Sequence, residues 1–220
     1  MKIKKTIFAS REEWLKAREG KIGGSDAGSI LGMTPWRSNV DLYREKIGLQ
    51  DPADLSENPL VQYGIKAEPL IRELFRIDYP ALQVLYEENN MFTNTDYPWA
   101  HVSLDAWLEE GETGKRGVLE IKTATVSSSL AAAKWKDNNL PQSYFAQVLH
   151  EMAVYNADFA YLRALLHYPR DGEPDRISIK DYYIDRKEVE EDIAYLMAKE
   201  KEFSECMKTR TEPPRILPTW

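Results

Sequence analysis

The spacing of apolar residues switches four times along this chain between helical and alternating, and this pattern restricts the possible folds more than any other sequence feature. Helical spacing behind capping residues predicts helices over 10–19, 25–32, 39–47 and 59–77. Alternating spacing then predicts strands over 82–87, 91–93, 100–108 and 117–123. Helical and alternating segments follow in turn, with helices over 127–136, 141–155 and 186–208 and strands over 159–168 and 176–184.

No linker or internal repeat interrupts this order of elements. We therefore expect a single α/β domain over residues 1–208. Three prolines fall between residues 211 and 220, so we expect residues 209–220 to form an extended tail.

The composition excludes several classes of protein. Hydrophobic residues make up 43% of the 220 residues, which is typical of a folded globular chain. No apolar run reaches the ~18 residues of a membrane helix, and no apolar stretch follows the basic residues 1–5, so we expect neither a membrane span nor a signal peptide. The single cysteine, Cys206, excludes an internal disulfide and a cysteine-ligated cluster, and we expect a cytoplasmic protein.

The charge is unevenly distributed. The net charge of −7, taken alone, argues against a nucleic-acid partner. Residues 1–50, however, carry 10 basic and 6 acidic residues, so the acidic excess lies beyond residue 50. A basic first fifth is compatible with an anionic ligand held there, although a chance fluctuation explains the same numbers.

The segment Val118-Leu-Glu-Ile-Lys122 places a carboxylate and an ammonium on one side of a strand. Asp105 ends the preceding alternating segment, and a hairpin between the two strands would bring it beside Glu120. Two close carboxylates repel each other unless a cation lies between them. Carboxylate oxygens, with the Ile121 carbonyl as a further ligand, suit Mg²⁺ or Mn²⁺, and Lys122 would hold or activate a water there.

This order, Asp followed by Glu-x-Lys on the next strand, is typical of the PD-(D/E)xK nucleases. In such sites a divalent ion polarises a phosphodiester and generates the attacking hydroxide. A surface ion pair between Glu120 and Lys122 on an edge strand is the alternative when these residues are taken alone.

Three further segments favour a phosphate-processing site. Ser25 would cap a helix whose free N–H groups attract anions, and Arg18 would supply a fork for phosphate oxygens. Glu68 shares a helix face with core-like residues and would complete a metal site. Gln147 would bond a scissile phosphate or a water. The alternatives are a plain helix cap with a solvated arginine, a surface glutamate and an amphipathic packing helix.

Together these blocks resemble the phage lambda-type exonuclease family, the YqaJ-type viral recombinases of the PD-(D/E)xK superfamily. The resemblance covers about residues 10–160 and lies in the order of five blocks: Trp14…Arg18…Ser25, Gly64…Glu68-Pro, Ser103-Leu-Asp105, Glu120-Ile-Lys122 and Gln147-Val-Leu-His150. Two departures are Leu104, where the family commonly has proline, and Gly23-Gly24, where it often has Thr-Ala. Neither removes a ligand.

The resemblance implies a restriction-endonuclease-like core, in which helices flank a central mixed, mostly antiparallel sheet. It also implies a Mg²⁺-dependent 5′-to-3′ exonuclease that digests one strand of linear double-stranded DNA. The 3′ overhang would serve a single-strand annealing protein in recombination, in a bacterial cell that carries the phage or prophage. Family members of this kind form rings of three subunits around DNA, so a homotrimer is implied here too.

The resemblance also assigns roles to individual residues. Two ions, Mg²⁺ or Mn²⁺, would be held by Asp105, Glu120, the Ile121 carbonyl and Glu68. Catalysis would further use Lys122 on water and Gln147 near the scissile phosphate, and the 5′ phosphate would be held by Arg18 and Ser25.

Three points remain open in the sequence. His101 is expected to be a hydrogen-bonded structural histidine. An endonuclease of the same superfamily is one rival function. A non-catalytic DNA-binding or scaffold subunit is the other, although the joint presence of Asp105, Glu120 and Lys122 argues against it.

Overall fold

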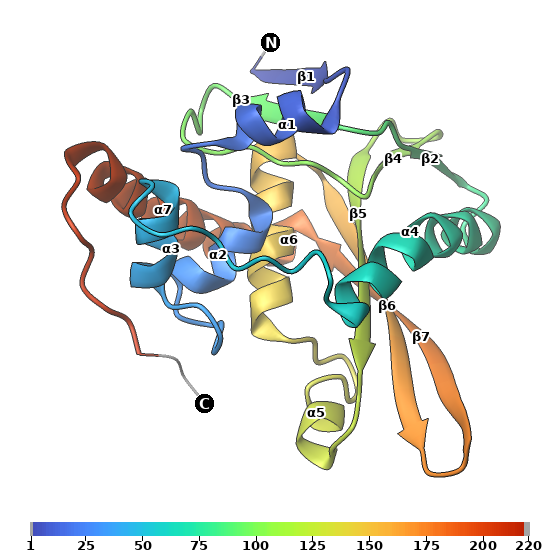
Figure 1. Ribbon diagram of the computed structural model, residues 1–220. Helices are drawn as coiled ribbons and strands as arrows, with labels where there is room; N and C mark the ends of the chain where they lie inside the picture. The colour runs from blue at the N-terminus through green and yellow to red at the C-terminus, as the bar shows by residue number, and fades with distance from the viewer. Residues whose placement is uncertain (1, 218–220) are drawn as a thin grey trace.

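The computed structural model describes residues 2–217, and a five-stranded sheet forms the centre of the molecule (Figure 1). The strands lie in the order β2-β4-β5-β6-β7. Their bounds are β2 Leu82–Leu85, β4 Ala106–Glu110, β5 Arg116–Thr125, β6 Phe159–Arg170 and β7 Glu173–Asp185. The pairs are antiparallel except for β5 and β6, which run parallel. The expected mixed, mostly antiparallel sheet is confirmed.

Helices cover both faces of this sheet (Figure 1). Helix α4 (Pro59–Asp78) packs on one face through Ile71 and Phe75, which contact Leu119 and Ile121 of β5 in one core cluster. Helix α6 (Gln142–Tyr155) packs on the other face with α7 (Glu190–Thr209) behind it. The remaining helices are α1 (Arg11–Arg18), α2 (Gly24–Ile30), α3 (Asn39–Lys46), α5 (Ser129–Ala133) and the 3₁₀ turn η1 (Arg186–Glu188).

The parallel pairing of β5 and β6 needs a crossover, which α5 and α6 provide. At the start of this pairing Gly117 is the register partner of Phe159. A Cβ at Gly117 would lie 2.3 Å from Cε2 of the Phe159 ring, so only glycine fits there. Arg163 of β6 is buried, and its guanidinium forms ion pairs with Asp78 of α4 and with Asp181 of β7. Arg163 therefore links α4 to β7.

Two β segments differ from the expectation. A strand β1 (Ile3–Ile7) pairs with β3 (Asn90–Asn94) in a separate two-stranded sheet, and the sequence analysis did not predict β1. The strand expected over 100–108 is wrong in its first half, because β4 begins only at Ala106. Residues 100–105 make isolated bridges to Ile22 and Phe92 instead, so this segment joins the two sheets rather than extending one.

Helix α2 also begins differently from the prediction. Its N-cap is Gly23, not Ser25, because the Asp26 carboxylate accepts a hydrogen bond from the Gly23 backbone N–H at 2.9 Å. Ser25 therefore lies inside the first turn. Helix α5 is shorter than the expected 127–136.

The C-terminal segment packs against the protein's own α3. The amide of the buried Asn39 donates to the carbonyl of Pro214 at 2.8 Å and accepts from the N–H of Ile216 at 3.0 Å. Arg44 pairs with Glu212. Residues 211–217 have no regular secondary structure, and the rest of the expected tail, 218–220, lies outside the described residues.

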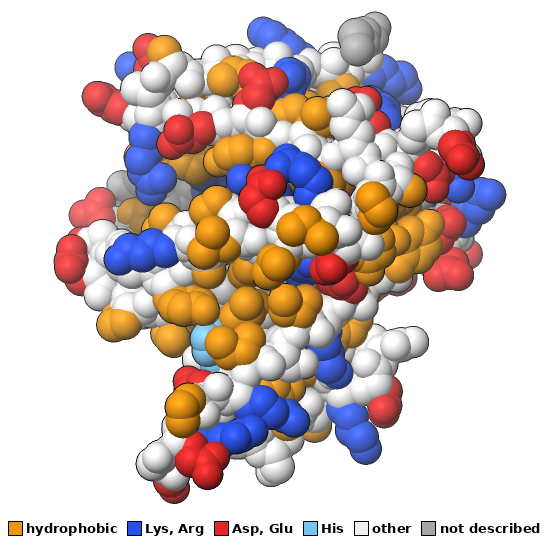
Figure 2. Space-filling model, turned by 90° about the vertical axis from the view of Figure 1, so that its right-hand side faces the viewer, with side chains coloured by type: hydrophobic (Ala, Val, Ile, Leu, Met, Phe, Trp, Pro, Cys, Tyr) orange, Lys and Arg blue, Asp and Glu red, His pale blue; other side chains and the backbone are white. Residues whose placement is uncertain are grey.

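Hydrophobic side chains gather on the face that carries α4 and the β6–β7 hairpin (Figure 2). Along α4 the exposed apolar residues are Leu60, Tyr63, Ile65, Leu70, Leu74 and Ile77. In the part of the chain from residue 2 to residue 217, no helix has the length and apolar character needed to cross a bilayer.

The close contact at Gly117 yields a stability prediction. Gly117→Ala forces a methyl group into the Phe159 ring and should lower the free energy of unfolding by about 1–3 kcal/mol. Chemical denaturation measures the change. The matched control is Gly111→Ala in the β4–β5 turn, where a Cβ meets no atom within 4 Å. Equal stability of the two variants would contradict the β5–β6 register described above.

Candidate active site

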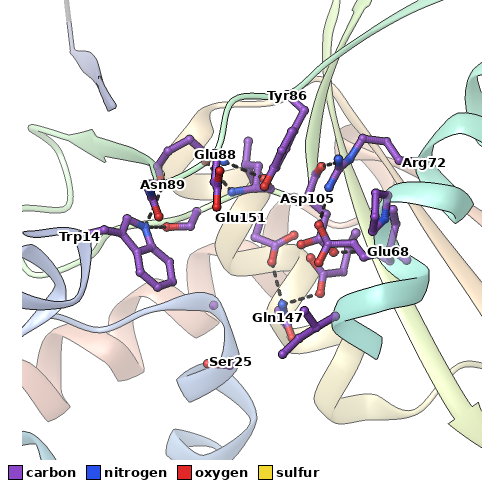
Figure 3. A pocket seen from close by; sticks show the side chains of 18 of the residues that line it. Trp14, Ser25, Glu68, Arg72, Tyr86, Glu88, Asn89, Asp105, Gln147 and Glu151 are labelled. Atoms are coloured by element: carbon purple, nitrogen blue, oxygen red, sulfur yellow. Dashed lines mark hydrogen bonds and ion pairs between the residues drawn. The ribbon is translucent and has the colours of Figure 1, made fainter. Parts of the chain in front are cut away.

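A cleft of about 750 Å³ opens beside the middle of β5, and the predicted site residues gather in it. Its walls come from α1, α2, α4, α6, the segment before β4 and β5 itself (Figure 3). Each site residue expected from the sequence lines this cleft: Arg18, Ser25, Glu68, Asp105, Glu120, Ile121, Lys122 and Gln147.

Glu120, Lys122 and Gln147 form a closed network at the floor of the cleft. The Lys122 ammonium lies 2.6 Å from Oε1 of Glu120. Lys122 also donates to Oε1 of Gln147 at 2.9 Å, and Nε2 of Gln147 donates to Oε1 of Glu120 at 2.6 Å. Glu120 is only 3% exposed because α6 covers this face of β5, so these residues are not the surface ion pair of the alternative interpretation.

Asp105 lies beside Glu120, as the hairpin argument predicted. The pairing of Ala106 with Leu119 sets the register of β4 on β5. Oδ2 of Asp105 accepts a hydrogen bond from the backbone N–H of Ile121 at 2.8 Å. The carboxylate of Asp105 is therefore fixed by the strand that carries Glu120 and Lys122.

Glu68 reaches the cleft because α4 approaches β5 closely one turn earlier. At Gly64 a Cβ would lie 3.2 Å from Oγ1 of Thr123, so a larger residue would push the helix away. Glu68 pairs with Arg72, the next residue on the same side of α4. Arg72 in turn donates to the carbonyl of Asp105 at 2.6 Å and lies 3.5 Å from the ring centre of Tyr86.

The crowding of carboxylates shifts their protonation equilibria. Burial, followed by repulsion from Glu120 and Glu68, raises the pKa of Asp105 well above its usual value. Burial also raises the pKa of Glu68, with Arg72 opposing the shift. Burial disfavours the ammonium of Lys122, but the Glu120 carboxylate outweighs it and the pKa of Lys122 rises. Lys122 is therefore a cation near neutral pH.

These residues suit a divalent cation in kind and in place. Carboxylate oxygens and a backbone carbonyl are hard donors, and a cation would relieve the repulsion that raises the pKa of Asp105. Within residues 2–217, no three acidic, His or Cys side chains are already gathered as ligands of one ion. Two of the carboxylates are instead paired with cations of the protein, Glu120 with Lys122 and Glu68 with Arg72.

Arg18 and Ser25 line the opposite end of the cleft. The indole N–H of Trp14 is shared between the carbonyl of Asn90 and Oγ of Ser103, both at 3.0 Å, which anchors α1 to this wall. The Arg18 guanidinium lies 4.0 Å from the Trp14 ring centre. Among the residues that the structure describes, no carboxylate forms an ion pair with Arg18.

His101 lines the cleft but is 2% exposed. Its backbone carbonyl accepts from Nε2 of His150 at 2.9 Å, and Nδ1 of His150 pairs with the buried Glu200 at 2.7 Å. The His101 side chain itself is not hydrogen-bonded at Nδ1 within the described chain, contrary to the expectation of a hydrogen-bonded histidine. Burial, together with the nearby Arg18 charge, lowers the pKa of His101 to about 2.

Glu151 is a cleft residue that sequence reasoning left without a role. It lies one helical turn after Gln147, is 1% exposed, and accepts from Nε2 of Gln147 at 2.9 Å (Figure 3). The available signal was a glutamate on the same helical face as Gln147, in a helix of largely apolar residues. Arg72 was missed as well, because its contacts depend on tertiary packing.

A second cleft adjoins the first at Ile121 and Lys122. Aromatic side chains line it, including Trp36, which is 74% exposed, and Tyr63, whose ring packs edge-on against His167. Lys122 therefore stands between a polar cleft and a more apolar one.

The fold resembles that of a known exonuclease. The crystal structure of an alkaline exonuclease, LHK-Exo, from Laribacter hongkongensis superposes with a TM-score of 0.56. The match covers 90% of this chain and 97% of the other, at 20% sequence identity, and the structure of LHK-Exo in complex with dAMP matches equally. At this identity the comparison shows a common fold.

Sequence comparison gives the family. The Uncharacterized protein YqaJ of Bacillus subtilis (strain 168) is 29% identical over 166 residues, which are 74% of this chain. The matched part is 49% of that relative, so this chain spans about half the length of that protein. The family model described as YqaJ-like viral recombinase domain matches residues 13–158, the region that contains every predicted site residue. The chain therefore belongs to the YqaJ-like viral recombinase domain family.

Proposed function

We propose that this protein is a divalent-metal-dependent exonuclease that digests one strand of linear double-stranded DNA from the 5′ end. The observation that carries the proposal is the convergence of Asp105, Glu120 and Lys122 in one cleft, where Gln147 bonds both Glu120 and Lys122. Membership of a viral recombinase family and a fold in common with an alkaline exonuclease support it.

Asp105, Glu120, Glu68 and the carbonyl of Ile121 would hold Mg²⁺, as two ions, with Mn²⁺ as a substitute. When bound, Mg²⁺ supplies charge stabilisation at the attacking and leaving oxygens of the phosphodiester. The protein contributes the fixed positions of these groups, because Asp105 is held by the Ile121 N–H and Glu120 by Gln147. Glu68 would exchange its partner Arg72 for the metal.

Lys122 would orient the attacking water and stabilise negative charge as a cation. The ammonium of Lys122 already lies in the cleft, 2.6 Å from Oε1 of Glu120, where it would meet such a water. Gln147 would keep the Lys122 ammonium directed into the cleft through its carbonyl oxygen.

Arg18 and Ser25 would bind the 5′ phosphate at the far end of the cleft. An arginine without a carboxylate partner among residues 2–217 is free to pair with phosphate oxygens, and stacking on Trp14 fixes its position. A 5′ phosphate held there would set the distance to the scissile bond, which would restrict digestion to the 5′ end.

The proposed partners extend the proposed activity. DNA ends would be the substrate, three copies of the chain would form a ring, and a single-strand annealing protein would take up the 3′ overhang. Membership of a viral recombinase family supports DNA as a partner. The setting would be the cytoplasm of a bacterial cell that carries a phage or prophage.

The first prediction concerns the cation beside the metal site. Lys122→Ala should lower the rate of digestion of linear duplex DNA by at least about 10²-fold, because the charge that stabilises the phosphoryl transition state is lost. Lys122→Arg keeps a cation for the buried Glu120 and should remain folded yet impaired. Release of nucleotides from each end-labelled strand measures rate and polarity together.

The exposed Lys115→Ala on the same hairpin is the matched control and should digest normally. Undiminished activity of folded Lys122→Ala would refute the assignment. Cleavage of closed circular DNA would indicate an endonuclease instead, and the absence of any cleavage by the wild type would indicate a binding or scaffold subunit.

The second prediction concerns the metal. Mg²⁺ at about 100 times its Kd should stabilise the wild type by about 2.7 kcal/mol, which raises Tm by several degrees. Asp105→Asn should lose most of this increase, because a carboxylate ligand is gone, whereas the exposed Asp51→Asn should keep it. Differential scanning fluorimetry with EDTA as the reference gives the values. The same Mg²⁺ response in both variants would place the metal elsewhere.

The third prediction concerns the 5′ phosphate. Arg18→Ala should raise KM for 5′-phosphorylated ends by about 10- to 100-fold and leave 5′-hydroxyl ends nearly unchanged, because a charge-assisted contact to phosphate is lost. Lys16→Ala, exposed on the same helix, should affect neither substrate. An equal loss on both kinds of end would show that Arg18 does not read the phosphate.

A further inference from the structure

Glu151 is a buried carboxylate whose interactions all lie inside the cleft. It is 1% exposed, and its Oε1 accepts the hydrogen bond from Nε2 of Gln147 at 2.9 Å. Its second oxygen, Oε2, has no hydrogen-bond partner within residues 2–217. A polar group this deeply buried destabilises the fold unless something compensates it, so its presence needs a reason.

The reason lies in the side-chain amide of Gln147, which has three charged neighbours. Its two N–H bonds go to two carboxylates, Glu120 and Glu151, while its carbonyl oxygen accepts from the ammonium of Lys122. An ammonium can only donate and a carboxylate can only accept. Only one orientation of the amide satisfies all three, because the reverse orientation sets its oxygen against both carboxylates.

Glu151 adds a third hydrogen bond that holds the amide in this orientation. Without Glu151, one N–H of the amide has no partner. A rotation of the Gln147 side chain would then break only the two bonds to Glu120 and Lys122, rather than three. An acceptor oxygen is present at position 151 in either protonation state of the carboxyl group, so the hydrogen bond from the Gln147 amide can form in both states.

The helix α2 keeps Glu151 in place. At Gly24 a Cβ would lie 3.0 Å from Oε1 of Glu151 and 3.2 Å from Cγ of Gln147. The backbone of the first turn of α2 therefore closes over both side chains. Neither can swing toward α2, and the carboxylate stays against the amide.

We propose that Glu151 is a positioning residue, whose carboxyl group fixes the amide of Gln147 and thereby aligns Glu120 and Lys122 for phosphodiester hydrolysis. This inference rests on the proposed nuclease function and deepens it. Glu151 touches neither DNA nor metal in this role and acts only through Gln147.

A double-mutant cycle tests this route of action. Glu151→Ala should lower kcat about tenfold with KM nearly unchanged, as expected for one hydrogen bond to a charged group. In the Gln147→Ala background the same substitution should cost nothing further. Glu151→Gln, which retains an acceptor oxygen, should recover most of kcat.

Val154→Ala is the matched control, because it removes buried volume from the same helix without reaching the cleft. It should lower Tm and leave kcat unchanged. A kcat loss in Glu151→Ala that persists in the Gln147→Ala background would overturn the proposal. So would a loss of Tm in Glu151→Ala with no loss of kcat, since that is the behaviour of a purely structural residue.

A second readout does not need activity. The side-chain amide protons of Gln147, identified in NMR spectra by their loss in Gln147→Ala, should be shifted from free glutamine values in the wild type. They should move toward those values in Glu151→Ala and stay in place in Val154→Ala. If the wild type does not cleave DNA, the proposed function fails, and this shift alone decides the positioning role: unmoved resonances in Glu151→Ala would overturn it.

Discussion

The burial of Glu120 in the middle strand of the sheet is the constraint on which this structure depends. A carboxylate that is 3% exposed costs several kcal/mol unless nearby groups compensate it. Lys122, two residues along the same strand, provides the countercharge, and Gln147 provides a hydrogen bond from the covering helix. The helix α6 must therefore dock with its polar edge over β5, and that edge forms the floor of the cleft.

Much of the site followed from the sequence because its geometry is local. Alternation along a strand places Glu120 and Lys122 on one side, and a hairpin of the observed length brings Asp105 next to them. The helix boundaries followed from caps, as at Ser10, whose hydroxyl accepts from the N–H of Glu13. These features depend on a few neighbouring residues, so patterns of spacing describe them well.

The features that the sequence analysis missed depend on contacts between segments that lie far apart in the chain. The strand β1 has only five residues and is defined by its partner β3, about 87 positions along the chain. Arg72 reaches Asp105 only after α4 has docked, and the role of Glu151 depends on the approach of Gly24. The spacing of apolar residues does not predict such pairings. The entropy cost of closing a loop grows only slowly with its length, so many different segments could meet at similar cost. The cap of α2 was mispredicted for a smaller reason, since Asp26 replaces the hydroxyl of Ser25 as the capping group.

The parallel pairing of β5 and β6 has a consequence for the order of folding. The two strands are joined by a crossover that contains α6, so Gln147 reaches Glu120 only once this long loop has closed. Contacts between distant segments form late and slowly, because the entropy of loop closure must be overcome first. A nascent or partly folded chain thus holds its acidic residues and Lys122 without their alignment. The proposed hydrolytic centre, which is built across this crossover, would therefore stay latent until the molecule around it is complete.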